Sequence, residues 1–291
     1  MENKKYITVG IKDMEGFKEY LIERENSAAT VQKYMTDIRT FYRFLGRDKR
    51  GDKQCRIDKQ HLIGYKTWLL DHYAVSSANS MIAALNQFLV YAGAGLLRLR
   101  RIRVQRQLFA VQEKEMSREE YRKLIAAANT KGKQMLALLI ETICATGIRV
   151  SELPYFTVEN VKSGRIQVRN KGKMRYILIP VLLKAKLMHY IQRAGITRGY
   201  IFRTRSGQPK DRSNIWSEMK ALHEEAGIDP RKIFPHNLRH LFAKVYYAAT
   251  KDFAGLADIL GHSSLEVTRI YAAPAISVYQ GRIESLGLCT G

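Results

Sequence analysis

The stretch that fixes the second half of this chain begins as Gln134-Met-Leu-Ala-Leu-Leu-Ile-Glu-Thr-Ile-Cys-Ala-Thr146 and continues as Gly147-Ile-Arg149-Val-Ser-Glu-Leu153. Its first part is almost wholly apolar, which predicts a buried helix. Gly147 lets the backbone turn at the end of that helix, so that the Arg149 guanidinium can point away from the core. Glu152 follows three residues later and is placed to orient Arg149 or to cap a local helix. Taken alone, an Arg-x-x-Glu pair is more often an ordinary surface ion pair.

Three later phrases carry side chains suited to phosphate chemistry. Pro235-His-Asn-Leu-Arg239-His240 places His236 and Arg239 three residues apart, near one face of a helix that the proline opens. Leu260-Gly-His262-Ser-Ser264 and Thr268-Arg-Ile-Tyr271-Ala272 follow, and the glycine of the first phrase predicts a helix stop. Guanidiniums bind phosphate through bidentate contacts, imidazoles transfer protons, and a tyrosine hydroxyl can attack phosphorus.

In this order, the four phrases resemble the tyrosine recombinase (phage integrase) family, closest to its short Xer-type members. The resemblance implies a site-specific recombinase that cleaves and rejoins DNA through a 3′-phosphotyrosyl link, with a free 5′-hydroxyl as the other product. It assigns the catalytic roles to Arg149 and Arg239 as phosphate clamp, to His236 and His262, and to Tyr271 as nucleophile. Tyr279 is the main rival for the last role, but it lacks the Thr-x-x-Tyr context.

The chemistry of these groups fits one reaction. A phenol has a pKa near ~10 and needs a base to accept its proton as it attacks, and His236 is the candidate for that base. Charge builds on the non-bridging oxygens in the transition state, where two guanidiniums supply positive donors. We expect His262 to hydrogen-bond the same phosphate and His240, which matches the family's next histidine, to brace the site.

The resemblance also implies a catalytic lysine, for which this chain offers two candidates. The family places it on a β-hairpin, where it gives a proton to the departing 5′ oxygen. In this chain the turn offers Lys171 and Lys173. Lys171, in Asn-Lys-Gly, fits the pattern better, and Lys173 is then expected to contact DNA. Either lysine is also explained as an ordinary solvated turn residue.

Composition agrees with a DNA partner. The chain of 291 residues has a formal net charge of +22 and a pI near 9.9. Such an imbalance favours a polyanionic partner, here double-stranded DNA, over a basic protein that binds other molecules only non-specifically.

Cys55, Cys144 and Cys289 are too scattered for a metal site or a disulfide framework, so we expect reduced thiols, no metal and no cofactor. No apolar run approaches the ~18 residues of a membrane span, and we expect a bacterial, cytoplasmic and nucleoid-associated protein.

Apolar periodicity predicts a mainly α-helical fold with a small β-hairpin. Residues 1–95 should form a small all-α DNA-binding domain of the core-binding type, in which one long helix is capped by Thr30 and stopped by Gly46. Residues 116–291 should form an α+β catalytic domain, which begins at a Ser117–Glu120 capping box. A hairpin is predicted from Arg165 to about Ile179.

The glycines and arginines between these domains predict a basic linker over residues 96–115. Its DNA-contacting residues are expected to be Arg98, Arg100, Arg101, Arg103 and Arg106. A half-buried strand or helix end is the alternative. The tail Ala272–Gly291 is expected to dock on a neighbouring protomer, because recombination needs four protomers on two duplexes.

Two other classes of function use similar parts. A DNA-binding regulator could keep the fold without catalysis, and a type IB topoisomerase shares the catalytic logic. The intact set of residues argues against the first, and the domain pair and small size argue against the second.

Overall fold

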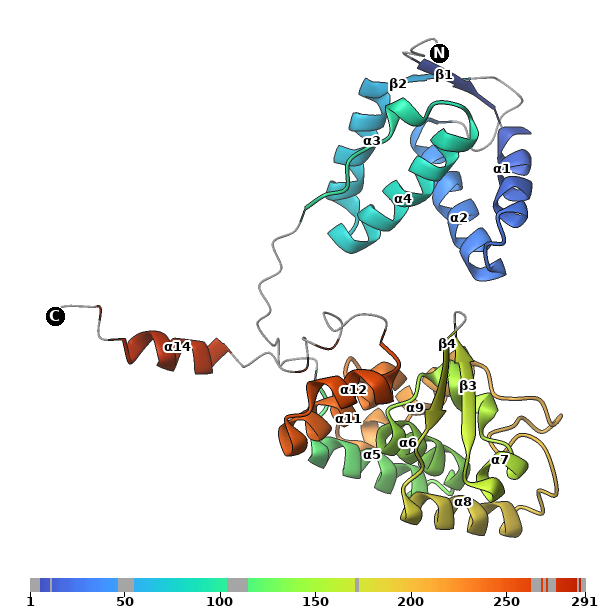
Figure 1. Ribbon diagram of the computed structural model, residues 1–291, viewed down its shortest axis with the longest axis vertical. Coiled ribbons are helices and arrows are strands. Elements are labelled where there is room, and N and C mark those ends of the chain that lie inside the picture. The colour runs from blue at the N-terminus through green and yellow to red at the C-terminus, as the bar shows by residue number, and fades with distance from the viewer. Residues whose placement is uncertain are drawn as a thin grey trace. The chain divides into compact units, whose positions relative to one another are not determined.

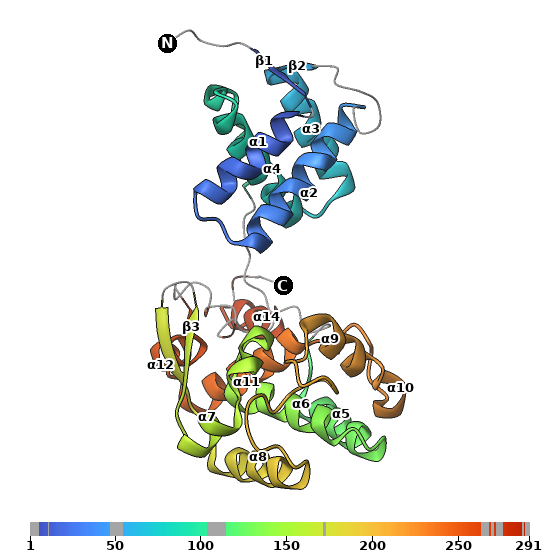
Figure 2. The same cartoon turned by 90° about the vertical axis from the view of Figure 1, so that its right-hand side faces the viewer.

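The chain divides into two compact units in the computed structural model, Met1–Arg106 (the N-terminal unit) and Gln107–Gly291 (the C-terminal unit) (Figures 1 and 2). The structure describes residues 6–10, 12–46, 55–103, 115–170, 173–262, 268, 271, 276–286 and 288. The fold is mainly helical with small antiparallel sheets, as predicted. No helix in these ranges is both long and apolar enough to pass through a lipid bilayer.

The N-terminal unit is a cluster of four helices with a two-stranded sheet at one end (Figure 1). Its elements are β1 (Tyr6–Val9), α1 (Lys12–Glu23), α2 (Ala28–Phe44), β2 (Cys55–Asp58), α3 (Lys59–His72), α4 (Val75–Tyr91) and the short 3-10 helix η1 (Gly95–Leu97). The helices pack through one apolar face each, and aromatic rings fill the centre: Phe17 meets Phe88 edge-on at 5.3 Å, and Phe41 meets Tyr65 at 4.9 Å.

Two expectations for this unit are wrong. The cap of α2 is Ser27 rather than Thr30, because the helix starts earlier and the Ser27 hydroxyl accepts a hydrogen bond from the Thr30 amide at 3.3 Å. The unit is also not all-α. β1 pairs antiparallel with β2, in the register Tyr6 to Asp58 and Val9 to Cys55. These four-residue strands are too short and too far apart in sequence for periodicity to reveal them.

Residues 97–103, which the sequence assigns to a linker, lie on the N-terminal unit in a fixed path. The Asn86 carboxamide donates to the Leu99 carbonyl at 2.9 Å and accepts from its amide at 2.8 Å. Asn79, two helical turns away on α4, binds Ile102 in the same way, at 3.0 and 2.8 Å. Lys59 donates to the Leu97 and Arg98 carbonyls at 2.8 and 2.6 Å. We call residues 97–103 the strap.

The C-terminal unit is a larger helical body with one hairpin (Figure 2). Its elements are α5 (Arg118–Thr130), α6 (Gln134–Thr146), η3 (Val150–Tyr155), α7 (Val158–Ser163), β3 (Ile166–Asn170), β4 (Lys173–Ile177), α8 (Val181–Arg193), α9 (Arg212–Lys220), α10 (His223–Ala226), α11 (Pro235–Thr250), α12 (Phe253–Leu260) and α14 (Ile276–Glu284). The predicted capping box of α5 is present, with the Ser117 hydroxyl and the Glu120 carboxylate each accepting the other's amide.

α6 is the central helix of this unit, as its apolar sequence predicts. It packs against α5, α8, α9 and α11. Most of its side chains are buried, including Leu139, Ile140 and Ile143 with no exposed surface. Buried threonines on the helix satisfy their hydroxyls by bonding backbone carbonyls one turn earlier, as Thr142 does to Leu138 at 2.8 Å. The apolar stretch therefore forms a rigid support that ends at the site described below.

The predicted hairpin forms from β3 and β4, which pair antiparallel from Ile166 with Ile177 to Asn170 with Lys173. Lys171 and Gly172, in its turn, lie outside the described residues. Ile201 and Phe202 form no strand. Isolated bridges flank them, Thr157 with Tyr200 and Arg203 with Pro209, so this segment is a loop held at two points.

Candidate active site

Arg149 is positioned by the end of α6 and the start of η3. Gly147 ends α6 with φ +64°, the left-handed conformation that glycine adopts most readily. A side chain at Gly147 would also overlap the Phe242 ring and would approach Leu260 to 2.9 Å. Glycine is required there for both reasons. The turn makes Arg149 the N-cap of η3, with its side chain about a third exposed.

Glu152 holds Arg149 in the two ways that the sequence suggests. One carboxylate oxygen accepts the Arg149 backbone amide at 2.8 Å and thereby caps η3. The other oxygen contacts the Arg149 guanidinium at 3.4 Å. Glu152 itself is buried, and its shorter charged contact, at 2.6 Å, is to Arg175 of β4.

Arg239 enters from α11 and is buried, with 2% of its surface exposed. Its guanidinium donates to the Gly147 carbonyl at 2.5 Å, to the Leu260 carbonyl at 2.7 Å, and contacts the His262 Nε2 at 3.1 Å. Burial, followed by repulsion from Arg149, lowers the pKa of Arg239 to about 10. The side chain therefore remains cationic at neutral pH in a site largely withdrawn from water.

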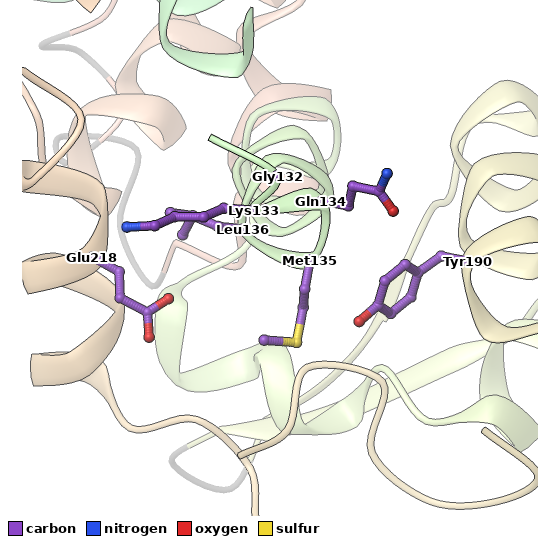
Figure 3. Close-up of a pocket in the computed structure, with 7 residues that line it drawn as sticks. All are labelled: Gly132, Lys133, Gln134, Met135, Leu136, Tyr190 and Glu218. Atoms are coloured by element: carbon purple, nitrogen blue, oxygen red, sulfur yellow. The ribbon is translucent and has the colours of Figure 1, made fainter. Parts of the chain in front are cut away.

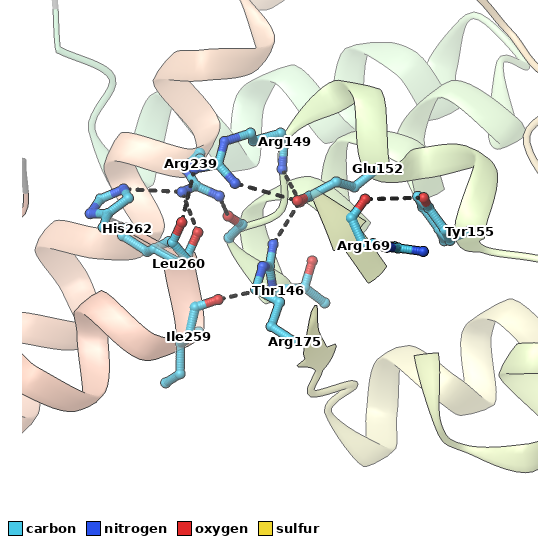
Figure 4. Close-up of polar contacts among 12 residues, drawn as sticks. Thr146, Arg149, Glu152, Tyr155, Arg169, Arg175, Arg239, Ile259, Leu260 and His262 are labelled. Atoms are coloured by element: carbon cyan, nitrogen blue, oxygen red, sulfur yellow. Dashed lines mark hydrogen bonds and ion pairs between the residues drawn. The ribbon is translucent and has the colours of Figure 1, made fainter. Parts of the chain in front are cut away.

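The C-terminal end of α12 gathers three arginines (Figure 4). Its last carbonyls belong to Ile259, Leu260 and Gly261, and they accept hydrogen bonds from Arg175 at 3.0 Å, Arg239 at 2.7 Å and Arg149 at 3.3 Å respectively. A helix C-terminus carries partial negative charge and unpaired carbonyls, so it attracts cations. The predicted helix stop, Gly261, has φ +63° and leads directly into His262.

His262 is held at both ring nitrogens. Nε2 faces an Arg239 nitrogen at 3.1 Å and Nδ1 lies 2.8 Å from the hydroxyl of the buried Thr268. A guanidinium can only donate, so Nε2 accepts and Nδ1 carries the proton that Thr268 accepts. Burial, then the charges of Arg239 and Arg149, lower the pKa of His262 to about 4, and the ring is neutral at physiological pH.

Tyr271 is buried against α11 and α12, on Ala243, Leu256 and Leu260, with 5% of its surface exposed. Its ring lies nearly parallel to that of His262, with 6.1 Å between centroids. Burial raises the pKa of its phenol, while the charge of Arg239 and a hydrogen bond from it act in the opposite direction. Tyr271 is therefore a protonated phenol that lies beside the buried Arg239 cation of the same unit.

His240, rather than His236, touches the tyrosine. The His240 ring lies 4.9 Å from the Tyr271 ring and 4.7 Å from the His236 ring, so it sits between the two. Burial, then the neighbouring His236 and Arg239, lower the pKa of His240 to about 4. His236 is exposed, and partial loss of hydration followed by nearby arginines lowers its pKa as well.

An open pocket of about 670 Å³ leads to the two predicted clamp arginines. Arg149, His236 and Arg239 line it. Its lining also contains side chains that the sequence does not single out: Arg212, Trp216, Lys220 and Arg231. The Trp216 ring is 47% exposed, and the Lys220 ammonium lies 5.1 Å from its centroid. The pocket is therefore cationic, with one exposed aromatic face, as a polyanion site requires.

Arg175 is the other site residue missed by sequence reasoning. The signal in the sequence is the spacing: Arg175 lies two residues before the apolar Ile177 and so shares its strand face. In the structure this face points inward, with Ile177 buried and Met174 and Tyr176 about 60% exposed. An arginine at an inward strand position needs an acceptor. Of the two hairpin lysines, Lys171 lies outside the described residues and Lys173 is described by its backbone alone.

A smaller pocket of about 360 Å³ contains none of the predicted site residues (Figure 3). It is lined by the start of α6 with Tyr190 and Glu218, and Glu218 forms an ion pair with Lys210. Within the described residues, no group of histidine, cysteine, aspartate and glutamate side chains is arranged to hold a metal. The chemistry-bearing side chains described above converge at the end of α12.

Comparison with known proteins agrees with this arrangement. The model of the phage integrase family matches residues 114–277, and the model of the phage integrase N-terminal SAM-like domain matches residues 14–94. The tyrosine recombinase XerA of Pyrococcus furiosus is 31% identical over 208 residues, 68% of this chain and 70% of the relative. XerD of Vibrio cholerae is 27% identical over 267 residues, 86% and 87% of the two chains.

The fold is shared with a solved lambda integrase tetramer bound to a Holliday junction, with a TM-score of 0.71 at 18% identity, covering 91% of this chain and 77% of that one. The first-arginine phrase, the His-x-x-Arg helix and the Tyr271 segment all lie inside the matched residues 114–277. Family model, relatives and site geometry lead to one conclusion: this chain belongs to the phage integrase family of tyrosine recombinases.

Proposed function

We propose that this recombinase cleaves DNA by attack of Tyr271 on a phosphate held between Arg149 and Arg239. The observation that carries the proposal is the convergence of these three side chains, from separate segments, within one unit. The Tyr271 oxygen forms a bond to phosphorus, the bond to the 5′ oxygen breaks, and a second 5′-hydroxyl later reverses the step. The guanidiniums stabilise the charge that develops on the non-bridging oxygens.

The attacking phenol must lose its proton, and we propose that the histidines accept it. His236 is the predicted base, and His240 lies between it and Tyr271. The lowered pKa values of both rings make them neutral, and hence proton acceptors, at physiological pH. We assign His262 to the phosphate in a protonated form, because Nε2, which accepts from Arg239 in this structure, must carry a proton to donate to a phosphate oxygen. Lys171 stays the predicted donor of the proton to the leaving 5′ oxygen.

DNA binding is proposed to use both units. In the strap, Arg98, Arg100, Arg101 and Arg103 are exposed while Leu97 and Leu99 are buried. This alternation presents a row of cations to a phosphate backbone. Arg106 lies outside the described residues, and Lys173 remains a prediction. The cationic pocket around Trp216 supplies the corresponding surface next to the site.

Assembly into a tetramer on DNA is also proposed. Each site cuts one strand, so exchange between two duplexes needs four sites, and the lambda integrase that shares this fold was solved as a tetramer on a Holliday junction. The predicted docking segment, Ala272–Gly291, includes α14 and exposes Ile283, Leu286 and Leu288 at 66%, 62% and 82%. Such exposed apolar side chains favour contact with another protomer. A cytoplasmic, nucleoid-associated location remains a prediction.

Covalent trapping tests the proposal. A duplex selected for binding from a random-sequence pool supplies the site, and a nick placed beside the cleavage position lets the short product strand escape. The wild-type chain should then accumulate a protein–DNA adduct, and Tyr271→Phe should form none while binding DNA normally. Tyr279→Phe is the matched control and should retain the adduct.

The same substrates separate the alternative functions. Binding without an adduct in the wild-type chain would indicate a regulator that lacks catalysis and would sink the proposal. An adduct together with relaxation of supercoiled DNA, but no strand exchange between two duplexes, would indicate a topoisomerase.

A further inference from the structure

Arg175 connects three elements of the catalytic unit that are far apart in sequence. It lies on β4 with a side chain only 14% exposed. One guanidinium nitrogen donates to Glu152 of η3 at 2.6 Å, and the other donates to the Ile259 carbonyl at the end of α12 at 3.0 Å (Figure 4). A single planar side chain thereby ties the hairpin to the helix start that carries Arg149 and to the helix end that precedes His262.

The distances show which arginine neutralises Glu152. The carboxylate is buried and needs a close cation. Arg175 lies at 2.6 Å, whereas the nearest Arg149 guanidinium nitrogen lies at 3.4 Å, at the limit of a hydrogen bond. The contact of Arg149 with the Gly261 carbonyl is also long, at 3.3 Å. Glu152 thus binds the backbone of Arg149 firmly and its guanidinium weakly, which leaves that guanidinium able to move onto a phosphate.

Gly261 leaves room for the contact of Arg175 with the end of α12. A side chain at that position would lie 2.6 Å from Cδ and 2.7 Å from Nε of Arg175, and the residue has φ +63°. The approach of Arg175 to the end of α12 therefore depends on the glycine. Since His262 is the next residue, any shift of Arg175 is transmitted to the peptide that carries the histidine.

We propose that Arg175 is a positioning residue of the reaction: it neutralises Glu152 so that the Arg149 guanidinium remains available for the scissile phosphate, and it fixes the α12 end beside it. The inference rests on the proposed role of Arg149. Without Arg175, Glu152 would take Arg149 as its ion-pair partner and withdraw it from the substrate. The competing explanation is that Arg175 only anchors the hairpin and contributes to folding.

Single-turnover cleavage of the nicked duplex distinguishes the two explanations. Arg175→Met should slow adduct formation on the order of 10²-fold, as small displacements of a catalytic group do, with DNA affinity little changed. Lys186→Met is the matched control, because it removes a cation from an ion pair with Glu141 that involves no site residue. It should cleave at the wild-type rate.

A substrate with a methylphosphonate at the scissile position gives a second test. If Arg175 only anchors the hairpin, its substitution should slow cleavage of this substrate and of the natural phosphate equally. One charged oxygen is replaced by a neutral methyl group, so cleavage depends less on guanidinium charge. The defects of Arg149→Ala and Arg175→Met should both shrink on this substrate. On the natural phosphate, the double variant should be no slower than Arg149→Ala alone, because both changes remove the same contribution, that of the Arg149 guanidinium. Equal losses on both substrates, or additive losses in the double variant, would overturn the proposal.

Arg175→Lys covers the case in which the methionine variant does not fold. Lysine keeps the charge but lacks the planar fork that reaches Glu152 and Ile259 together. It should fold and retain part of the rate on the natural phosphate, with a deficit that again shrinks on the methylphosphonate. A wild-type rate with Arg175→Lys, or a deficit that is the same on both substrates, would contradict the proposal. Absence of adduct in the wild-type chain would instead count against the proposed function itself.

Discussion

The strap and the end of α12 both concentrate arginines, but they fix opposite parts of the residue. In the strap, neutral asparagines hold the backbone at Leu99 and Ile102, and the side chains of Arg100, Arg101 and Arg103 are exposed. At the end of α12, the guanidiniums of Arg175 and Arg239 are themselves fixed, on the carbonyls of Ile259 and Leu260. The same side chain is displayed in one region and immobilised in the other.

The difference follows from what each region must do. Exposed charges attract a polyanion over a distance, but water and salt screen them, so each contributes little and the loss of one is tolerated. Charges fixed in a site with little water act strongly on nearby developing charge, because no reorganisation is needed when the reaction occurs. Affinity should therefore depend on many arginines of the first kind and rate on a few of the second.

Substitution of Arg239 gives the largest expected effect. Arg239→Lys keeps a cation but cannot satisfy the Gly147 and Leu260 carbonyls and contact His262 together. Single-turnover adduct formation should fall by about 10²–10³-fold, and each buried carbonyl left unpaired should cost about 1–3 kcal/mol of unfolding free energy. A cleavage rate within a few-fold of wild type would remove the distinction between immobilised and displayed arginines.

Acid should destabilise the C-terminal unit through its buried histidines. His240 and His262 have pKa values of about 4 in the folded chain against 6.5 in the unfolded one, so the unfolded chain binds protons that the folded chain does not. The stability that depends on their neutral rings is fully present above pH 6.5 and is lost as the pH falls toward 4.

In a Trp68→Phe background, the fluorescence of Trp216 reports unfolding of the C-terminal unit alone. Its unfolding midpoint should decrease over this pH range, and His240→Gln should flatten the decrease. A midpoint with no pH dependence there would contradict the assignment of neutral rings.

Loosening the strap should give a moderate effect. Asn86→Ala removes both hydrogen bonds to Leu99, about 1 kcal/mol each, so that local opening of the strap becomes easier by roughly tenfold or more. Limited digestion with trypsin should show faster cleavage after Arg100 and Arg101, while the cleavage rate on the nicked duplex stays near wild type. Gln87→Ala, at the exposed neighbouring position of α4, is the control and should digest like the wild-type chain.

Removal of one displayed arginine should give the smallest effect. Arg101→Gln should weaken binding to all DNA sequences alike and reduce the slope of log affinity against log salt by about one. Arg193→Gln, exposed at the end of α8, should leave the slope unchanged. If the loss with Arg101→Gln were confined to one sequence, that arginine would read bases instead of binding phosphate.

Much of the architecture could be predicted from local pattern. The helix over Gln134–Thr146, the capping box at Ser117 and the hairpin follow from periodicity and capping, because these features depend on near neighbours in the sequence. The pairing of β1 with β2 and the choice of Ser27 over Thr30 could not be predicted, since short strands and neighbouring hydroxyl residues give ambiguous local signals.

The candidate site was predicted residue by residue through the family resemblance, and its internal contacts were not. Side chains that bond backbone carbonyls from distant segments leave no periodic trace, and this is how Arg175, Asn79 and Asn86 act. The contact of His240, rather than His236, with Tyr271 likewise depends on how α11 lies against the Tyr271 segment.

The carbonyls at the end of α12 should lower the affinity of this enzyme for small anions. The two arginines proposed to clamp the phosphate already donate to oxygen atoms of the backbone, so an incoming anion competes with these oxygens. Free inorganic phosphate has only its own few contacts with which to do so. A phosphate within a duplex is also held by the contacts that the enzyme makes with the neighbouring phosphates. The enzyme is therefore expected to tolerate cellular phosphate and nucleotides that would inhibit an open arginine pair.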